Sequence, residues 1–117
     1  MRGLTIVVAG AAAARLHAAL SLAAANAALE GRTRVFLQAE AVSLLGGAEE
    51  DRRYAVAGMP SLGELIDEVL AMGVEIIACQ SGLALEGLHA DALPPGIVTG
   101  GLVGLLSDGA DDQLLAV

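Results

Sequence analysis

Hydrophobic positions follow two alternating patterns along this chain. Short, continuous aliphatic runs are typical of strands buried on both faces, as in parallel sheets. We expect a strand of this kind at 4–9, and further strands at 33–37, 74–79, within 96–101 and at 112–117. Between them, apolar residues at helical spacing predict helices within 10–31 and 60–73. We expect a short helix or a loop at 39–47, a short, irregular helix within 81–93 and a brief helix at 102–109. This alternation predicts an α/β fold with a mainly parallel sheet of about five strands.

Two of the expected helices carry additional signals. The helix within 10–31 has an apolar stripe, and Gly31 is placed to end it. The stripe consists of Leu16, Leu20, Ala23 and Ala27. In the next long helix, Ser61 and Glu64 have the spacing of a capping box, and Gly73 is placed to end the helix.

The most polar stretch of the chain, 48–58, interrupts both patterns. It contains the acidic run 49–51, followed directly by Arg52 and Arg53, which pair some of that charge. We expect this stretch to be an exposed loop.

The composition indicates one domain that spans residues 1–117. Hydrophobic residues make up 56% of the chain, which suggests elements buried on both faces or an apolar contact with other subunits.

The Ala-rich region 9–29 is long enough to span a membrane. However, it contains Arg15, His17 and Asn26, and alanine drives insertion weakly. We therefore expect no membrane partner and a cytoplasmic location.

The charge balance argues against nucleic acid as a partner. Six arginines, no lysine and fourteen acidic residues give a net charge of −8, and Tyr54 and Phe36 are the only aromatic residues.

The chain contains a single cysteine, which excludes a disulfide within the chain and suits a reducing compartment. His17, His89 and Cys79 lack the spacing of zinc ligands, so we expect neither a metal nor a cofactor.

The lone cysteine, Cys79, ends an expected strand, where open parallel sheets bind ligands. The N–H groups at the start of a following helix favour a thiolate, as a nucleophilic or persulfide-carrying cysteine requires. Gln80 and Ser81 can donate hydrogen bonds to a ligand, and Gly82 lets a ligand approach the backbone. Free cysteine is also among the residues most often buried in cores, so an inert Cys79 stays open as an alternative.

Other strand ends and side chains offer weaker candidates. Gly100 and Gly101 follow the fourth expected strand and can form a pocket floor or simply a tight turn. The segment 9–15, AGAAAAR, lacks the glycine spacing of nucleotide-binding loops and predicts a plain strand-to-helix turn. We expect His17 to be partly buried or at the surface, and His89 to be at the surface.

Several segments together resemble the DsrE/DsrF/TusD-like family of small sulfur-relay proteins. They are LTIVV, HAALSLAAANAALEGRTRVFL, GVEIIACQSGLALEGL, GIVTGGLVGLL and DQLLAV. The resemblance implies a three-layer α/β/α sandwich and assembly into trimers or hexamers. It also implies that Cys79, by its position in the motif, carries a persulfide or thiosulfonate group between donor and acceptor proteins. Unlike some members, this chain has no second cysteine, so its cargo must pass to a thiol of another molecule.

Three hypotheses about function follow from these observations. The first is a sulfur carrier or sulfurtransferase-like protein that uses Cys79. The second is a non-catalytic structural or binding subunit of such an assembly, in which Cys79 is inert. The third is a thiol peroxidase-like enzyme, which ranks lowest because no arginine or threonine stands beside the cysteine in the sequence.

Overall fold

A five-stranded sheet forms the centre of the fold, with its strands in the order β4-β3-β2-β1-β5. The structure, a computed structural model, describes residues 2–46 and 52–117. The strands are β1 Leu4–Ala9, β2 Thr33–Gln38, β3 Glu75–Cys79, β4 Val98–Gly100 and β5 Gln113–Ala116. Every neighbouring pair is parallel, which confirms the expected α/β class and the expected type of sheet.

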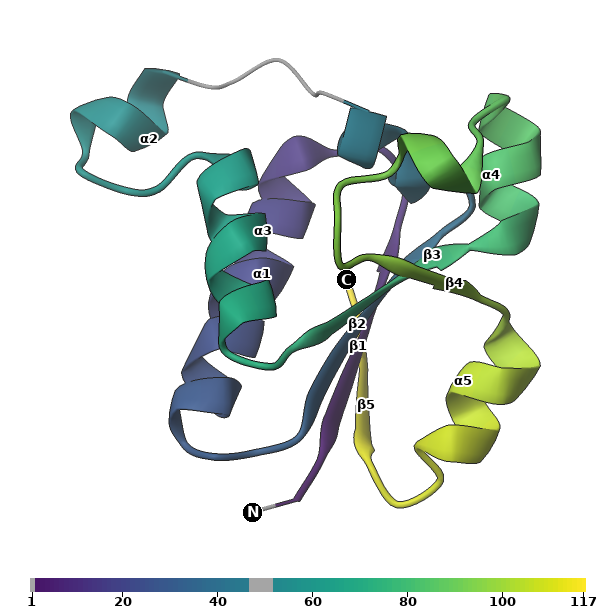
Figure 1. The fold of residues 1–117 in the computed structure, drawn as a ribbon. Helices are drawn as coiled ribbons and strands as arrows, with labels where there is room; N and C mark the ends of the chain where they lie inside the picture. The colour runs from purple at the N-terminus through teal and green to yellow at the C-terminus, as the bar shows by residue number, and fades with distance from the viewer. Residues whose placement is uncertain (1, 47–51) are drawn as a thin grey trace.

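Helices lie on both faces of this sheet (Figure 1). The α-helices are α1 Ala13–Ala28, α2 Arg52–Val56, α3 Leu62–Ala71, α4 Gln80–Glu86 and α5 Leu102–Asp108. Two 3₁₀ segments, η1 Ala39–Gly46 and η2 Ala90–Ala92, complete the described elements. Helices α1 and α3 cover one face, whereas α4 and α5 lie on the other side of the strands (Figure 1).

The main hydrophobic core lies between the sheet and the α1–α3 layer. The stripe expected on α1 is buried at Leu16, Leu20 and Ala23, and Ala27 packs against the core. The expected capping box of α3 is confirmed: Glu64 N–H donates to Ser61 Oγ at 3.1 Å, and Ser61 N–H donates to Glu64 Oε1 at 3.2 Å. Helix α3 ends before Gly73, which has the left-handed φ of 86° that a helix end requires.

Two local expectations differ from the structure. Helix α1 ends at Ala28, and Glu30, not Gly31, adopts the left-handed conformation, with φ of 65°. Gly31 is instead required by close packing, because a Cβ there would lie 2.5 Å from the Asn26 Nδ2 atom. The loop expected over 48–58 is wrong for residues 52–56, which form α2. The acidic run 49–51 lies outside the described residues.

The second helical layer is thinner than the first. Helix α5 has seven residues, and Leu105 is its only buried side chain. Strand side chains alternate between faces, so Thr5, Arg34 and Ile77 face α5, whereas their neighbours in sequence face α1 and α3. Within residues 2–46 and 52–117, no helix is both long and apolar enough to cross a membrane.

Candidate functional site

Cys79 lies at the junction of β3 and α4, as the sequence predicts. It is the last residue of β3 and the N-cap of α4, with extended backbone at φ −63° and ψ 123°. Its Sγ atom accepts a hydrogen bond from the backbone N–H of Gly82 at 3.3 Å. The residue is 8% exposed, so the thiol is held just beneath the surface. This geometry points an N–H group of the first turn of α4 at the sulfur atom.

Gly82 brings α4 into close contact with the segment after β2. A Cβ at this position would lie 2.5 Å from the carbonyl oxygen of Ala39, the first residue of η1. Ala39 itself has a left-handed φ of 51°, which is uncommon for a residue with a side chain. The backbone of Ala39 therefore occupies the space beside Gly82 where the sequence predicts that a ligand can approach. This contact fixes the turn that holds Cys79.

Gln80 and Ser81 occupy the first turn of α4, directly after Cys79. Both residues are exposed. Neither side chain takes part in any hydrogen bond among the described residues, so both amide and hydroxyl groups are available to a partner.

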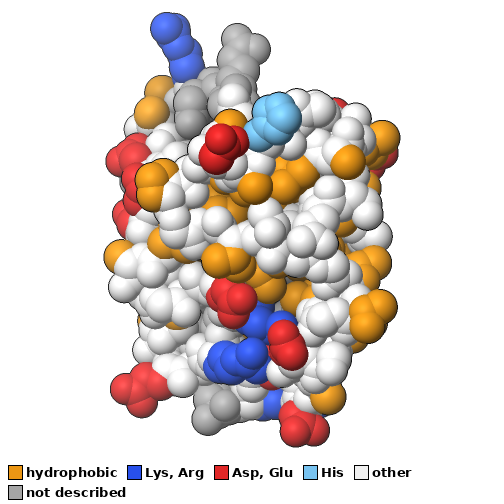
Figure 2. All heavy atoms as spheres, turned by 45° about the vertical axis from the view of Figure 1, so that its right-hand side comes forward, with side chains coloured by type: hydrophobic (Ala, Val, Ile, Leu, Met, Phe, Trp, Pro, Cys, Tyr) orange, Lys and Arg blue, Asp and Glu red, His pale blue; other side chains and the backbone are white. Residues whose placement is uncertain are grey.

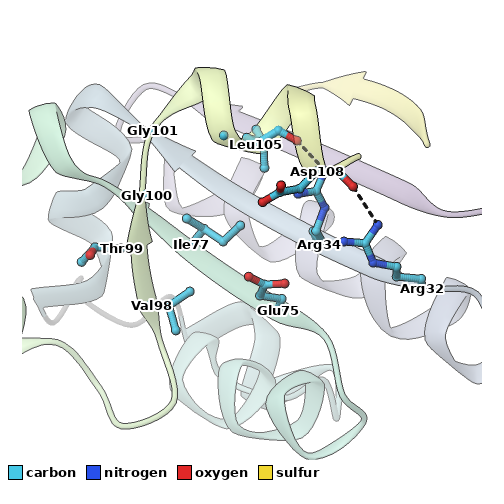
Figure 3. A pocket seen from close by; sticks show the side chains of 11 residues that line it. Arg32, Arg34, Glu75, Ile77, Val98, Thr99, Gly100, Gly101, Leu105 and Asp108 are labelled. Carbon is cyan, nitrogen blue, oxygen red and sulfur yellow. Dashed lines mark hydrogen bonds between the residues drawn. The ribbon is translucent and has the colours of Figure 1, made fainter. Parts of the chain in front are cut away.

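Gly100 lies next to Cys79 across the ladder between β3 and β4. Gly100 and Gly101 line a cavity of about 140 Å³ between these strands and α5. Figure 3 shows this cavity, with Ile77 and Val98 on its strand side and Leu105 on its helix side. The structure thus brings Gly100 beside the cysteine, although it is about twenty positions later in the chain. Cys79 itself does not line the cavity.

Charged side chains at the far end of this cavity do not follow from the sequence pattern. Arg32, Arg34, Glu75 and Asp108 line it together with the glycines (Figure 3). Figure 2 shows basic and acidic side chains next to one another in the lower half of the face that it presents. The signal in the sequence is Arg34, a charged residue within the expected strand 33–37. The mixture of two cations and two anions gives no preference for an anionic or a cationic ligand.

The remaining candidates lie away from Cys79. His17 is buried on α1, on the opposite side of the sheet, where its ring stacks on Tyr54 and its Nε2 atom lies 3.0 Å from the Pro60 carbonyl oxygen. His89 is exposed. In segment 9–15 the N-cap of α1, Ala12, makes no side-chain cap. No group of three His, Cys, Asp or Glu residues that could hold a metal ion occurs in the described ranges.

Comparisons with known proteins agree with this architecture. No curated protein matches the chain. The ychN protein from E. coli is 22% identical and has a TM-score of 0.74, with both chains fully covered. MTH1491 from Methanobacterium thermoautotrophicum, a protein of unknown function, is 17% identical with the same TM-score and full coverage. BT1422 from Bacteroides thetaiotaomicron, also of unknown function, is 18% identical with a TM-score of 0.74, and 99% of this chain and 95% of that chain are covered.

These similarities to solved structures concern the fold. The family is established by the sequence itself, because the match to the DsrE/DsrF-like family runs over residues 3–110 and includes β3, Cys79 and α4. The chain is therefore a member of the DsrE/DsrF-like family.

Proposed function

We propose that this protein is a sulfur carrier that uses Cys79 to accept sulfane sulfur and pass it to another molecule. The observation that carries the proposal is the position of Cys79. It ends a parallel strand at the ligand-binding edge of the sheet, and the Gly82 N–H donates to its sulfur. A backbone N–H in this position stabilises negative charge on Sγ in the thiolate, which is the form that attacks in the first transfer step and leaves in the second.

The transfer takes place in two displacement steps without net oxidation. The Cys79 thiolate attacks the outer sulfur of a donor persulfide, a new S–S bond forms at Sγ, and the donor leaves as a thiolate. An acceptor thiolate then attacks the outer sulfur on Cys79, and Cys79 leaves as the thiolate. Because the chain has a single cysteine, no second thiol of the same chain can intercept the persulfide.

Gln80 and Ser81 are placed to assist this exchange. Their exposed side chains follow Cys79 directly and can donate hydrogen bonds to the incoming donor or to the acceptor. Gly100 and Gly101 leave backbone accessible in the neighbouring cavity. The partners are sulfur donor and acceptor proteins and further copies of this chain, in the cytoplasm.

Intact-mass spectrometry after incubation with a persulfidated donor protein tests the proposal. We expect the chain to gain the mass of one sulfur atom and to lose it on addition of an acceptor thiol. The matched control is Cys79→Ser, which removes the only thiol. A wild-type chain that gains no sulfur, or a gain that survives Cys79→Ser, contradicts the proposal.

A second candidate function is favoured by the burial of Cys79. At 8% exposure, the residue also fits a structural subunit in which the thiol is inert. The rate of labelling by a thiol reagent distinguishes the two functions. Labelling of the native protein near neutral pH supports the carrier, whereas labelling only after unfolding supports the structural subunit.

A further inference from the structure

The cavity between β3, β4 and α5 has an unpartnered hydrogen-bond donor at its charged end. Arg34 lies on β2, between Thr5 of β1 and Glu75 of β3 in the register of the sheet. Its Nε and Nη2 atoms donate to Thr5 Oγ1 at 3.2 and 2.8 Å, and Nη2 also donates to the Leu105 carbonyl oxygen at 2.8 Å. The third nitrogen, Nη1, has no hydrogen bond or ion pair with any described residue.

The orientation of the guanidinium turns this third nitrogen towards the cavity. Nε and Nη2 form the edge that faces Thr5 and β1, so Nη1 lies on the opposite side of the group, towards β3. Glu75 of β3 and Arg34 both line the cavity. The Arg34 side chain is only 3% exposed, yet no side-chain nitrogen of the described residues is both fully buried and unpartnered. Nη1 is therefore accessible from the cavity.

Charges of both signs surround this end of the cavity, where Arg32, Arg34, Glu75 and Asp108 line the wall. Figure 3 shows the Glu75 carboxylate on the strand side and the Asp108 carboxylate on the helix side. Both residues are exposed, and neither carboxylate has a hydrogen bond or ion pair with a described residue. Asp112 offsets part of the arginine charge from outside the cavity, because its Oδ2 atom lies 3.5 Å from Arg34 Nη2 and 3.6 Å from Arg32 Nη1.

The rest of the cavity is small and largely apolar. Ile77, Val98 and Leu105 supply its aliphatic side chains. Its volume of about 140 Å³ corresponds to about five water molecules at ~30 Å³ each. This space admits a ligand of a few non-hydrogen atoms with a short aliphatic group, and it is too small for a nucleotide.

From these features we infer that the cavity binds the zwitterion of a free α-amino acid with a short side chain, such as alanine. The ligand carboxylate accepts charge-assisted hydrogen bonds from Arg34 Nη1 and from Arg32, and the ammonium group donates to Glu75 and Asp108. A simple carboxylate would be repelled by the two acidic residues, and a simple amine by the two arginines. A zwitterion instead meets the opposite charge at each end.

This binding function is separate from sulfur transfer. Cys79 does not line the cavity, and its neighbour across the ladder, Gly100, contributes no side chain to it. The sulfur gain at Cys79 is therefore an independent readout. A chain that gains sulfur but does not bind alanine refutes the amino-acid site alone, whereas a chain that binds alanine but gains no sulfur refutes the carrier function alone.

Isothermal titration calorimetry of the full chain near neutral pH tests the inference with three matched compounds. L-Alanine carries both charges, propionate lacks the ammonium group, and ethylamine lacks the carboxylate. We expect alanine to bind, and each of the other two to bind at least about tenfold more weakly, because each loses its charge-assisted hydrogen bonds at one end. A wild-type chain that does not bind alanine, or that binds propionate or ethylamine equally well, overturns the inference.

Two variants locate the site without altering the buried Arg34. Glu75→Gln removes one carboxylate charge, and Gly104→Leu adds a side chain at the cavity wall, where nothing lies within 4 Å of a Cβ. We expect alanine to bind about tenfold more weakly to Glu75→Gln and not detectably to Gly104→Leu. The matched controls on α3 are Glu68→Gln, which is also exposed, and Gly63→Leu, which also has open space around its Cβ.

Both controls should bind alanine as wild type does, and circular dichroism shows whether each variant keeps its fold. Unchanged alanine binding in both cavity variants, or an equal loss in the α3 controls, places the ligand elsewhere and overturns the inference.

Discussion

Arg34 and Asp112 form a buried ion pair that joins β2 to the start of β5. Arg34 Nη2 lies 3.5 Å from Asp112 Oδ2, and the two side chains are 3% and 8% exposed. Arg34 also donates to the Leu105 carbonyl oxygen at 2.8 Å, so the same guanidinium holds α5 against the sheet. Gly109 packs directly on this pair, and a Cβ there would collide with Arg34.

Removing one partner of this pair should strongly destabilise the fold. Asp112→Leu leaves the Arg34 charge buried without its carboxylate, which costs about 3–5 kcal/mol of unfolding free energy. The double variant Arg34→Met/Asp112→Leu removes both charges, and we expect it to be more stable than Asp112→Leu. Urea unfolding at one fixed protein concentration measures both variants. A double variant that is no more stable than Asp112→Leu would contradict this account.

The contact between Gly82 and Ala39 predicts an unusual sensitivity at position 82. Gly82→Ala forces the backbone of α4 or η1 to shift, because a Cβ would lie 2.5 Å from the Ala39 carbonyl oxygen. We expect a loss of about 1–3 kcal/mol in unfolding free energy. Gly63→Ala in α3 is the matched control: nothing lies within 4 Å of a Cβ there, and we expect no loss of stability. Equal effects of the two substitutions would show that the close packing at Gly82 is unimportant.

Cys79 can be replaced by serine without loss of the helix cap. Its Sγ accepts from the Gly82 N–H, and a serine Oγ is a preferred acceptor at this position. We expect Cys79→Ser to unfold within about 0.5 kcal/mol of wild type, whereas Cys79→Ala loses about 1 kcal/mol. Thermal and urea unfolding check the order. If serine and alanine are equally destabilising, the hydrogen bond to Sγ contributes nothing to the fold.

The sequence was sufficient for the order of elements and for the position of Cys79. Continuous apolar runs identify the strands, although the edge strands β4 and β5 are largely exposed. The run before Cys79 stops where β3 ends. The register that puts Gly100 beside Cys79 follows from the parallel order of β3 and β4. The order of all five strands was not readable, because each parallel strand has the same pattern whichever neighbour it pairs with.

Features that depend on distant contacts could not be read from the sequence. Arg34 and Asp112 are far apart in the chain, and nothing local to either residue indicates the other. Helix α2 contains no buried residue and has no apolar stripe, so its segment resembles a loop. The sequence indicates space for a ligand at Gly82 and gives no sign of Ala39, because the approach of Ala39 depends on the path of the chain after β2.

Helix α2 is held by a tertiary contact, which gives the last prediction. The Tyr54 ring stacks on His17, with ring centroids 4.1 Å apart and an angle of 8° between the planes. Stacked rings of this kind contribute about 0.5–1.5 kcal/mol, so Tyr54→Ala should loosen the segment without unfolding the core.

Hydrogen exchange measures this loosening at the amides of Ala57 and Met59, which donate to the carbonyl oxygens of Arg53 and Tyr54. We expect their exchange to be about two to ten times faster in Tyr54→Ala, as the stacking energy implies. Val56→Ala is the control on the same helix, because Val56 is exposed and its loss should leave the exchange unchanged. Equal acceleration in both variants would mean that the intrinsic helix propensity of residues 52–56, and not the contact with His17, maintains α2.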